Sequence, residues 1–269
     1  MYFLTKANVI ASQFFWENLS ENSQKRLCRL TSSFYGSRLS KIFIPLFCNR
    51  YNLTAEKLKN YLPASDKNEF QSFQDFFTRK LAYQLKIFSD FVWPCEGFVC
   101  ENGKFSDLGE INIKGNLINA KEIFGRFNCD IKSDCTFVNI FLHNHNYHRF
   151  HSPINGTVED IQFISGKLLF LRPWLYQKSK VSFPSFLNER VIVKMKDQNQ
   201  KMWLVCFVAG MGVGNIKLHA NVAIGNQITV GEEIGLFLLG STCCLSVPYS
   251  LVSKRYMEPV EVGSNIKFI

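Results

Sequence analysis

The sequence has no long run of apolar residues. A helix that crosses a bilayer needs about 20 mostly apolar residues, whereas the longest apolar stretches here, 42–48 and 203–214, are short and contain Pro45 or several glycines. Near the N-terminus, Lys6 precedes a short apolar segment, and no small-residue cleavage pattern follows it. We therefore expect neither a membrane-spanning helix nor a secretory signal.

Paired cysteines and metal-binding cysteine spacings are also scarce. The nine cysteines are an odd number scattered over 269 residues, unlike the dense disulfide framework of a small secreted domain. Four residues separate Cys95 from Cys100, and no second pair of cysteines matches this spacing, so a zinc knuckle is disfavoured. We expect reduced thiols in a cytosolic setting.

Repeats, low-complexity linkers and strand-helix-strand alternation are absent as well. These absences exclude a solenoid and a doubly wound sheet. What is present is a hydrophobic fraction of 46% with 26 phenylalanines, which is typical of an ordered globular protein.

Positive charge is in excess, with a formal net charge of +9, and it is concentrated near the N-terminus. Residues 20–60 contain eight Lys or Arg and two acidic residues, beside the apolar clusters 14–16 and 42–47. This combination suits an anionic membrane surface. An equally good interpretation is a solvated basic face on helices whose apolar side is core. No nucleic-acid-binding motif is present, so we expect no nucleic-acid partner.

Residues 9 to about 87 have helical character. Three hydroxyl residues are placed to cap helices: Ser20 before a helix with Leu27, Leu30 and Phe34 on one face, Thr54 before a helix that Pro63 ends, and Ser72 before a helix through Leu81.

From residue 91 onward, short runs rich in Val, Ile, Phe and Leu alternate with Gly and Asn turns, which indicates an antiparallel sheet. The sequence therefore predicts an α+β protein: a helical N-terminal region, 1–88, followed by an antiparallel β barrel or sandwich-like domain, 89–269, with the boundary between 86 and 92. The expected strands are 136–142, 156–164, 167–171, 190–195, 202–209, 214–220, 223–230 and 234–239.

Four of the five histidines lie in one stretch, as His143, His145, His148 and His151. His143 and His145 would share one face of a strand and could hold zinc, although no third ligand is apparent. His148 and His151 could instead transfer protons, because imidazole titrates near neutral pH. An isolated histidine is more often a hydrogen-bonded structural residue.

Gly240-Ser241-Thr242 follows the last apolar run and a turn. After a residue without a side chain, the backbone can be held in a strained conformation in which Ser241 attacks its own peptide bond. The ordinary alternative is a turn with a capping hydroxyl.

The chain resembles the phosphatidylserine decarboxylase proenzymes from about residue 70 to the C-terminus. The resemblance rests on the order of several short segments, each weak alone. They are Phe73 to Leu81, Pro94-Cys95-Glu96-Gly97, Ile113-Lys114-Gly115 with Ile123-Phe124-Gly125, Tyr147 to Pro153 with Gly156, Asn188 to Val191, Val213 to Ile216, Gly231 to Gly235, and Leu239-Gly240-Ser241-Thr242.

The resemblance implies that the chain cuts itself between Gly240 and Ser241 and that Ser241 becomes a covalent pyruvoyl group, with no metal and no diffusible cofactor. It assigns the base for self-cleavage to His151, the acid that orients this base to Glu96, and proton transfer during decarboxylation to His148. Glu96 stands where the family has Asp, a side chain one methylene shorter.

The implied reaction converts phosphatidylserine to phosphatidylethanolamine and carbon dioxide. The resemblance also implies that the two chains stay associated, and it leaves open whether the protein forms a homodimer. A lipid substrate further suggests a peripheral protein on the cytoplasmic face of a bacterial membrane, docked through Phe14, Phe15 and Trp16. Two alternatives stay open: a lipid-binding homologue that has lost self-cleavage, and a zinc hydrolase that uses His143 and His145.

Overall fold

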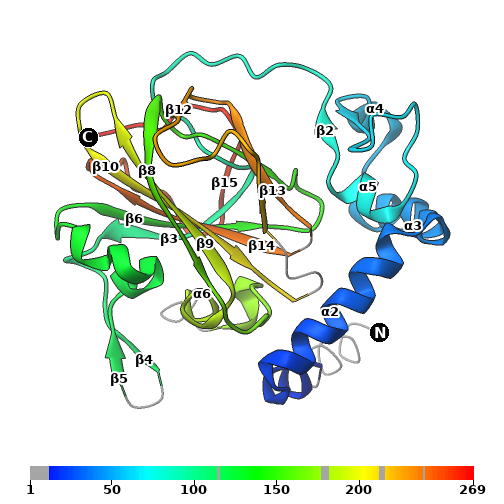
Figure 1. Ribbon diagram of the computed structural model, residues 1–269, viewed down its shortest axis with the longest axis horizontal. Helices are drawn as coiled ribbons and strands as arrows, with labels where there is room; N and C mark the ends of the chain where they lie inside the picture. Colours follow the sequence, from blue (N-terminus) through cyan, green and yellow to red (C-terminus); the bar gives the residue numbers. More distant parts are fainter. Residues whose placement is uncertain (1–11, 114–115, 177–181, 212–215, 239) are drawn as a thin grey trace.

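The computed structural model describes residues 12–269 apart from 114–115, 177–181, 212–215 and 239. Figure 1 shows a group of helices beside a large antiparallel sheet. The helices are residues 12–18, α2 (Glu21–Gly36), η1 (Arg38–Ile42), α3 (Phe43–Tyr51), α4 (Ala55–Leu58), α5 (Phe73–Phe77), η2 (Ala120–Asp130), η3 (Pro173–Leu175) and α6 (Phe183–Leu187).

All strands except β1 and β2 lie from residue 97 onward. The strands are β1 (Tyr61–Leu62), β2 (Lys80–Leu81), β3 (Gly97–Lys104), β4 (Ile111–Ile113), β5 (Asn116–Ile118), β6 (Thr136–Leu142), β7 (Arg149–His151), β8 (Gly156–Ile164), β9 (Arg190–Asp197), β10 (Met202–Ala209), β11 (Ile216–Leu218), β12 (Gln227–Ile228), β13 (Glu233–Phe237), β14 (Ser241–Val247) and β15 (Glu258–Val260).

The predicted α+β class is confirmed, and the β part is a sandwich. Eight strands form an antiparallel sheet in the order β12-β8-β9-β10-β14-β6-β3-β15, and a second sheet has the order β11-β13-β7. In the order of described strands the large sheet ends at β12 and β15, which do not pair with each other, so it is no closed barrel.

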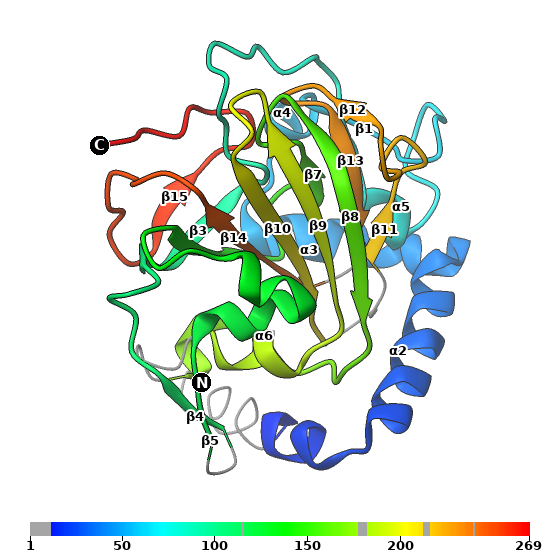
Figure 2. The same cartoon turned by 60° about the vertical axis from the view of Figure 1, so that its left-hand side comes forward.

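Each face of the large sheet is covered by a separate apolar cluster. The three-stranded sheet covers one face, where Phe150, Ile234 and Phe237 pack with residues such as Val205 and Leu245. On the other face, η2 packs its apolar side onto residues of β6, β9 and β10, and α6 lies nearby (Figure 2). Strand β14 therefore runs through the middle of the molecule, paired on both sides.

All three predicted helix caps are confirmed, whereas two helix ends are wrong. The hydroxyls of Ser20, Thr54 and Ser72 accept hydrogen bonds from the third backbone N–H that follows. The second and third helices end earlier than predicted, at Leu58 and Phe77, because the chain then pairs Tyr61–Leu62 with Lys80–Leu81 as β1 and β2. A local apolar pattern does not reveal this distant pairing.

Most predicted strands are confirmed. Those at 136–142, 156–164 and 202–209 have the predicted bounds, and β9 extends two residues beyond its prediction. The predicted strand 167–171 is wrong: only Lys167 forms a bridge, with Asn188. The strands predicted at 214–220 and 223–230 shorten to β11 and β12, and the one predicted at 234–239 becomes β13, which begins one residue earlier and ends two residues earlier. Parts of the first and last predictions lie outside the described residues. The domain boundary between 86 and 92 stays a prediction.

The N-terminal helices are fastened to the sandwich by polar contacts. Trp16 is 8% exposed and donates its indole N–H to the carbonyl of Leu168. The ammonium of Lys25 lies 2.6 Å from Glu21 and 3.3 Å from Glu189, so it joins α2 to the residue before β9. Within the described residues, none of the helices has the length and apolar character needed to cross a bilayer.

Asp75 ties the helical region together through hydrogen bonds. Its buried carboxylate accepts from the backbone N–H and the hydroxyl of Ser65 and from the backbone N–H of Gln71. Three donors from the loop that leads into α5 thus take the place of water around the Asp75 carboxylate. A buried charge is tolerated when it is hydrogen-bonded in this way.

We expect Asp75→Asn to lower the free energy of unfolding by about 1–3 kcal/mol. The NH2 group of the new amide would face the N–H and O–H groups that now donate to the carboxylate, so one buried donor would lose its partner. Denaturant unfolding followed by tryptophan fluorescence measures this free energy. The matched control Asp66→Asn, at an exposed ion pair with Lys80, should change it by less than about 1 kcal/mol. Equal effects of the two variants would contradict the account.

Candidate active site

Ser241 is the first residue of β14 and is fully buried. It pairs with Ala209 of β10 on one side and Leu142 of β6 on the other. Because side chains alternate along a strand, Ser241 shares a face with Cys243, which packs in the core between the two sheets. Its hydroxyl has no hydrogen-bond partner, which is unusual for a buried polar group and marks it as a functional candidate.

Gly240 has a backbone conformation that disfavours side chains, as the sequence predicted for the residue before the serine. Its φ is +51°, in the left-handed region that glycine enters without steric cost. A Cβ at Gly240 would lie 3.0 Å from the carbonyl oxygen of Met211. The residue before Ser241 is therefore restricted to glycine by conformation and by space.

The carbonyl oxygen of Gly240 accepts a hydrogen bond of 2.8 Å from the backbone N–H of Gly210. A Cβ at Gly210 would lie 3.0 Å from this oxygen, so the close approach depends on glycine at both positions. Sequence reasoning did not identify Gly210. A glycine directly after a strand was a signal, but its partner depends on the register between β10 and β14.

His148 is a buried neutral imidazole with one free nitrogen. Its Nδ1 lies 2.9 Å from the carbonyl oxygen of Asn146, and since a carbonyl only accepts, Nδ1 carries the proton and Nε2 keeps its lone pair. Nε2 is buried without a partner. Burial lowers the pKa of His148 to about 3, so the ring is uncharged at neutral pH and able to accept a proton.

Glu96 reaches His148 through Asn146 and does not hydrogen-bond to His151. Its carboxylate accepts from the side-chain amide of Asn146 at 2.5 Å and from the backbone N–H of Tyr147 at 3.2 Å. The resemblance made Glu96 the acid that orients His151, and this role stays a prediction, since the hydrogen bonds of Glu96 in this structure are with Asn146 and Tyr147. The carboxylate holds the residue whose carbonyl orients His148.

His151 lies on the opposite side of β7 from Phe150, which stacks on Phe207 in the core. Its Nδ1 donates to the carbonyl of Gly231 at 2.8 Å, and its Nε2 accepts from the hydroxyl of Tyr147 at 3.1 Å. Burial lowers the pKa of His151. Both ring nitrogens are thus engaged, neither of them with Glu96 or Ser241.

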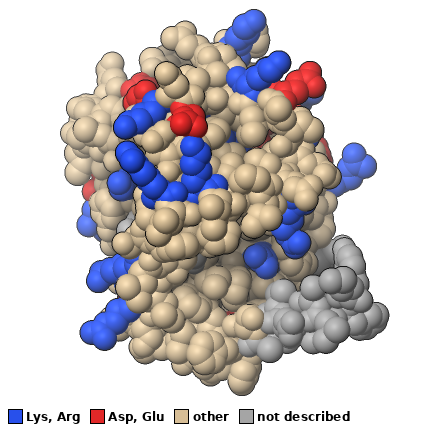
Figure 3. All heavy atoms as spheres, turned by 90° about the vertical axis from the view of Figure 1, so that its right-hand side faces the viewer, with Lys and Arg blue, Asp and Glu red and all other residues tan. Residues whose placement is uncertain are grey.

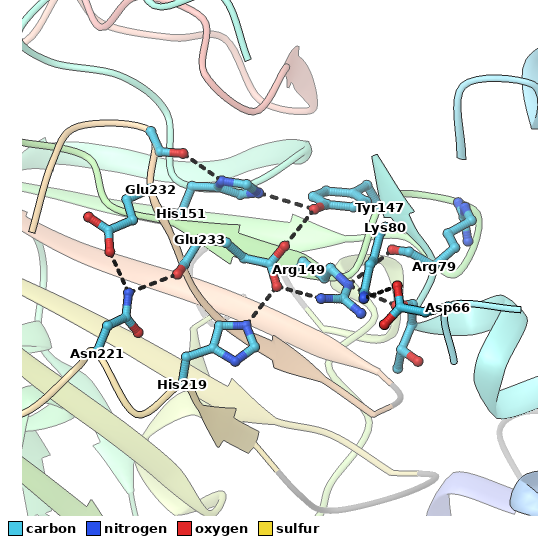
Figure 4. A network of polar contacts seen from close by, with 12 residues as sticks. Asp66, Arg79, Lys80, Tyr147, Arg149, His151, His219, Asn221, Glu232 and Glu233 are labelled. Atoms are coloured by element: carbon cyan, nitrogen blue, oxygen red, sulfur yellow. Dashed lines mark hydrogen bonds and ion pairs between the residues drawn. The ribbon is translucent and has the colours of Figure 1, made fainter. Parts of the chain in front are cut away.

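Glu233 is the centre of the polar network around His151, as Figure 4 shows. It accepts from Arg149 at 2.5 Å and lies 2.6 Å from Nε2 of His219. Burial opposes ionisation of Glu233, yet the adjacent Arg149 and His219 keep its pKa below the usual value. This network fixes the outer side of β7 and β13.

His143 and His145 also come together, with ring centroids 4.4 Å apart. They pack against Tyr51 rather than against a carboxylate. Among the described residues, no group of three His, Cys, Asp or Glu is placed to hold a metal ion. The zinc alternative therefore lacks a third ligand there.

Comparison with known proteins gives a consistent result. The family model for phosphatidylserine decarboxylase matches residues 73–268. Phosphatidylserine decarboxylase proenzymes of Halalkalibacterium halodurans, Campylobacter jejuni and Psychrobacter arcticus are 26%, 28% and 24% identical, over 83%, 74% and 91% of this chain and 84%, 80% and 92% of the relative.

The matched region contains the whole candidate site, from Glu96 to Ser241, although the similar segments 113–115 and 213–216 lie partly outside the described residues. The sequence resemblance depended on the order of short segments, and two of these segments supply His148 and His151 and Gly240 and Ser241 to the site. The chain belongs to the phosphatidylserine decarboxylase family, whose members are carboxy-lyases.

Proposed function

We propose that this protein cuts itself between Gly240 and Ser241 and then decarboxylates phosphatidylserine to phosphatidylethanolamine. One observation carries the proposal: the buried Ser241 hydroxyl has no partner, and it follows a left-handed glycine whose carbonyl oxygen is held by the N–H of Gly210. If the serine only capped a turn, as in the alternative interpretation, its hydroxyl would have a hydrogen-bond partner.

Self-cleavage begins when the Ser241 oxygen attacks the carbonyl carbon of Gly240. Negative charge develops on the carbonyl oxygen, where the N–H of Gly210 stabilises it. The C–N bond breaks and an ester remains. Loss of the Ser241 α-proton then expels the Gly240 carboxylate and separates residues 1–240 from 241–269. Hydrolysis of the remaining enamine consumes one water, releases ammonia and leaves the pyruvoyl ketone.

His148 is the base that the geometry favours for the first step. It lies on the same side of the β7 ladder as the core residue Phe150, and its backbone carbonyl accepts from the N–H of Phe237, three residues before Gly240. Its Nε2 is free, whereas Nε2 of His151 is occupied by Tyr147. The resemblance assigned the base to His151, whereas this proposal assigns it to His148.

Glu96 is a positioning residue in this scheme. Its carboxylate holds Asn146, and the Asn146 carbonyl in turn keeps the proton of His148 on Nδ1. An orienting acceptor serves this purpose in serine nucleophile sites generally. The additional methylene of Glu, compared with Asp, suits a carboxylate that acts through an intervening residue.

The residues around Ser241 fit a pyruvoyl group, because the glycine turn, the N–H of Gly210 and the free hydroxyl are what its formation requires. Once present, the group supplies an electron sink for decarboxylation. The two chains are expected to stay associated, since β14 pairs with β6 along its whole length and with β10 over residues 241–246.

We expect His148→Gln to slow self-cleavage by about 10²–10⁴-fold, the usual contribution of a general base, and His151→Gln to slow it less than tenfold. The wild-type rate should be equal at pH 5 and pH 8, because the pKa of His148 near 3 keeps the base neutral throughout. Gel time courses of freshly refolded chain measure the rates.

Ser241→Ala is the control and should remain one chain without decarboxylase activity. A severe defect in His151→Gln together with normal cleavage in His148→Gln would return the base role to His151. Cleavage of the Ser241→Ala chain would remove Ser241 from the mechanism.

The outer surface of the N-terminal helices, residues 12–46, is proposed to dock on an anionic membrane, on the cytoplasmic side of a bacterial cell. Lys and Arg side chains are spread over this face (Figure 3). Large apolar side chains are exposed on residues 12–46 in unusual number, which favours contact with lipid over a structural role. They are Phe14, Phe15, Leu27, Leu30, Phe34, Leu39, Ile42 and Leu46.

Trp16 is not part of this surface, which corrects the expectation that it docks with Phe14 and Phe15. Its ring is buried against Leu168 and Phe170. Trp16 therefore fixes residues 12–18 to the sandwich, while Phe14 and Phe15, 72% and 65% exposed, remain outward.

We expect Phe14→Ser combined with Phe15→Ser to weaken binding to liposomes of anionic phospholipid by about tenfold or more, because each inserted side chain gains about 1.5–3 kcal/mol. Sedimentation with liposomes measures binding. Phe88→Ser, at a loop residue that is 82% exposed, is the matched control and should bind normally. Unchanged binding of the double variant would refute this docking surface.

A further inference from the structure

A small cavity lies between the end of α3, the start of η3 and the end of β6. Its volume is about 130 Å³. Two cationic side chains and several aromatic ones line it: Arg50, Tyr51, Phe141, His143, Arg172 and Trp174. Neither the reaction at Ser241 nor the network around Glu233 uses these residues.

The cavity carries positive charge without an acidic counterpart. In the part of the chain that the structure describes, neither Arg50 nor Arg172 forms an ion pair with a carboxylate. Burial, together with the neighbouring positive groups, including both arginines, lowers the pKa of His143 to about 4. His143 is therefore neutral, and its buried Nδ1 has no hydrogen-bond partner.

These features suit an anion with several acceptor oxygens. Guanidinium groups match phosphate geometry and donate two parallel hydrogen bonds. The guanidinium carbons of Arg50 and Arg172 lie 5.9 Å and 5.6 Å from the rings of Tyr51 and Phe170. Stacking on these rings leaves the guanidinium edges available to an anion.

The cavity lies at the end of the large sheet where β14 begins, on the face opposite to the Ser241 side chain. Phe141, in its wall, pairs with Thr242, the residue after Ser241. At its other side, Trp174 is 52% exposed, and Leu46 of α3 is 64% exposed on the proposed docking surface. A ligand in this cavity would thus have the start of β14 on one side and apolar side chains at the surface on the other.

We propose that this cavity binds the phosphodiester of the lipid substrate, with Arg50 and Arg172 on its oxygens and His143 as a neutral hydrogen-bonding group. The inference rests on the proposed function. It assigns the phosphate to this cavity, the serine part of the headgroup to the Ser241 end of β14, and the acyl chains to the side of Trp174 and Leu46.

Binding is tested separately from catalysis by using the uncut Ser241→Ala chain, in which the removed hydroxyl had no partner. Calorimetry measures the affinity for glycerophosphoserine, a soluble phosphodiester, and for inorganic phosphate. We expect Arg172→Gln or Arg50→Gln to weaken glycerophosphoserine binding about tenfold or more. Arg26→Gln, at an exposed cation of α2, is the matched control and should bind normally.

In the processed enzyme, Arg172→Gln should raise KM for phosphatidylserine in neutral detergent micelles about tenfold and change kcat little. Complete self-cleavage of this variant, seen by intact mass, would separate a binding defect from a processing defect. A wild-type chain that never cleaves would refute the proposed function, while the calorimetric result would still decide the cavity's ligand.

The proposal is overturned if glycerophosphoserine binds the Arg172→Gln and unmodified Ser241→Ala chains equally. It is also overturned if inorganic phosphate binds there more tightly than glycerophosphoserine and KM is unchanged, because the cavity would then take free phosphate rather than the headgroup.

Discussion

The hydrogen bond from the N–H of Gly210 to the carbonyl oxygen of Gly240 is the interaction on which the site depends. It exists because β10 and β14 pair in one register, with Ala209 opposite Ser241. A shift of one residue would turn Ser241 to the other face of the sheet. In the proposed self-cleavage, the large sandwich holds one peptide bond in a fixed position, with the donor already aimed at its oxygen.

Burial supplies the second condition for the proposed self-cleavage. A serine hydroxyl is a weak nucleophile and needs a neutral base, and a histidine in water would be partly protonated near pH 6.5. His148 is fully buried between the helical region, where Phe77 contacts its ring, and the sandwich. The helical region therefore has two uses: one side keeps His148 neutral, and the other presents apolar and basic side chains.

Sequence patterns predicted the local features well. Helix caps at Ser20, Thr54 and Ser72 are contacts within four residues, and strands such as β6 and β10 are continuous buried runs, so both can be recognised from the chain alone. The order of short motifs located the candidate serine and histidines. These parts require no knowledge of which segments meet.

What the sequence could not provide depends on distant pairing. The β1–β2 ladder, the burial of Trp16 against Leu168 and the approach of Gly210 to Gly240 each join segments far apart in the chain. The same holds for Glu96, whose carboxylate contacts Asn146. Motif order identified Glu96 as part of the site, but only the three-dimensional structure shows which groups it contacts.

The central claim is that Ser241 is consumed to make the catalytic group. Intact-mass and fragmentation spectrometry of the purified wild-type protein tests this directly. The account predicts two chains, 1–240 and 241–269, with a pyruvoyl group and no amine at the start of the smaller one. A single chain that persists for days, or a smaller chain that begins with an unmodified serine, would contradict it.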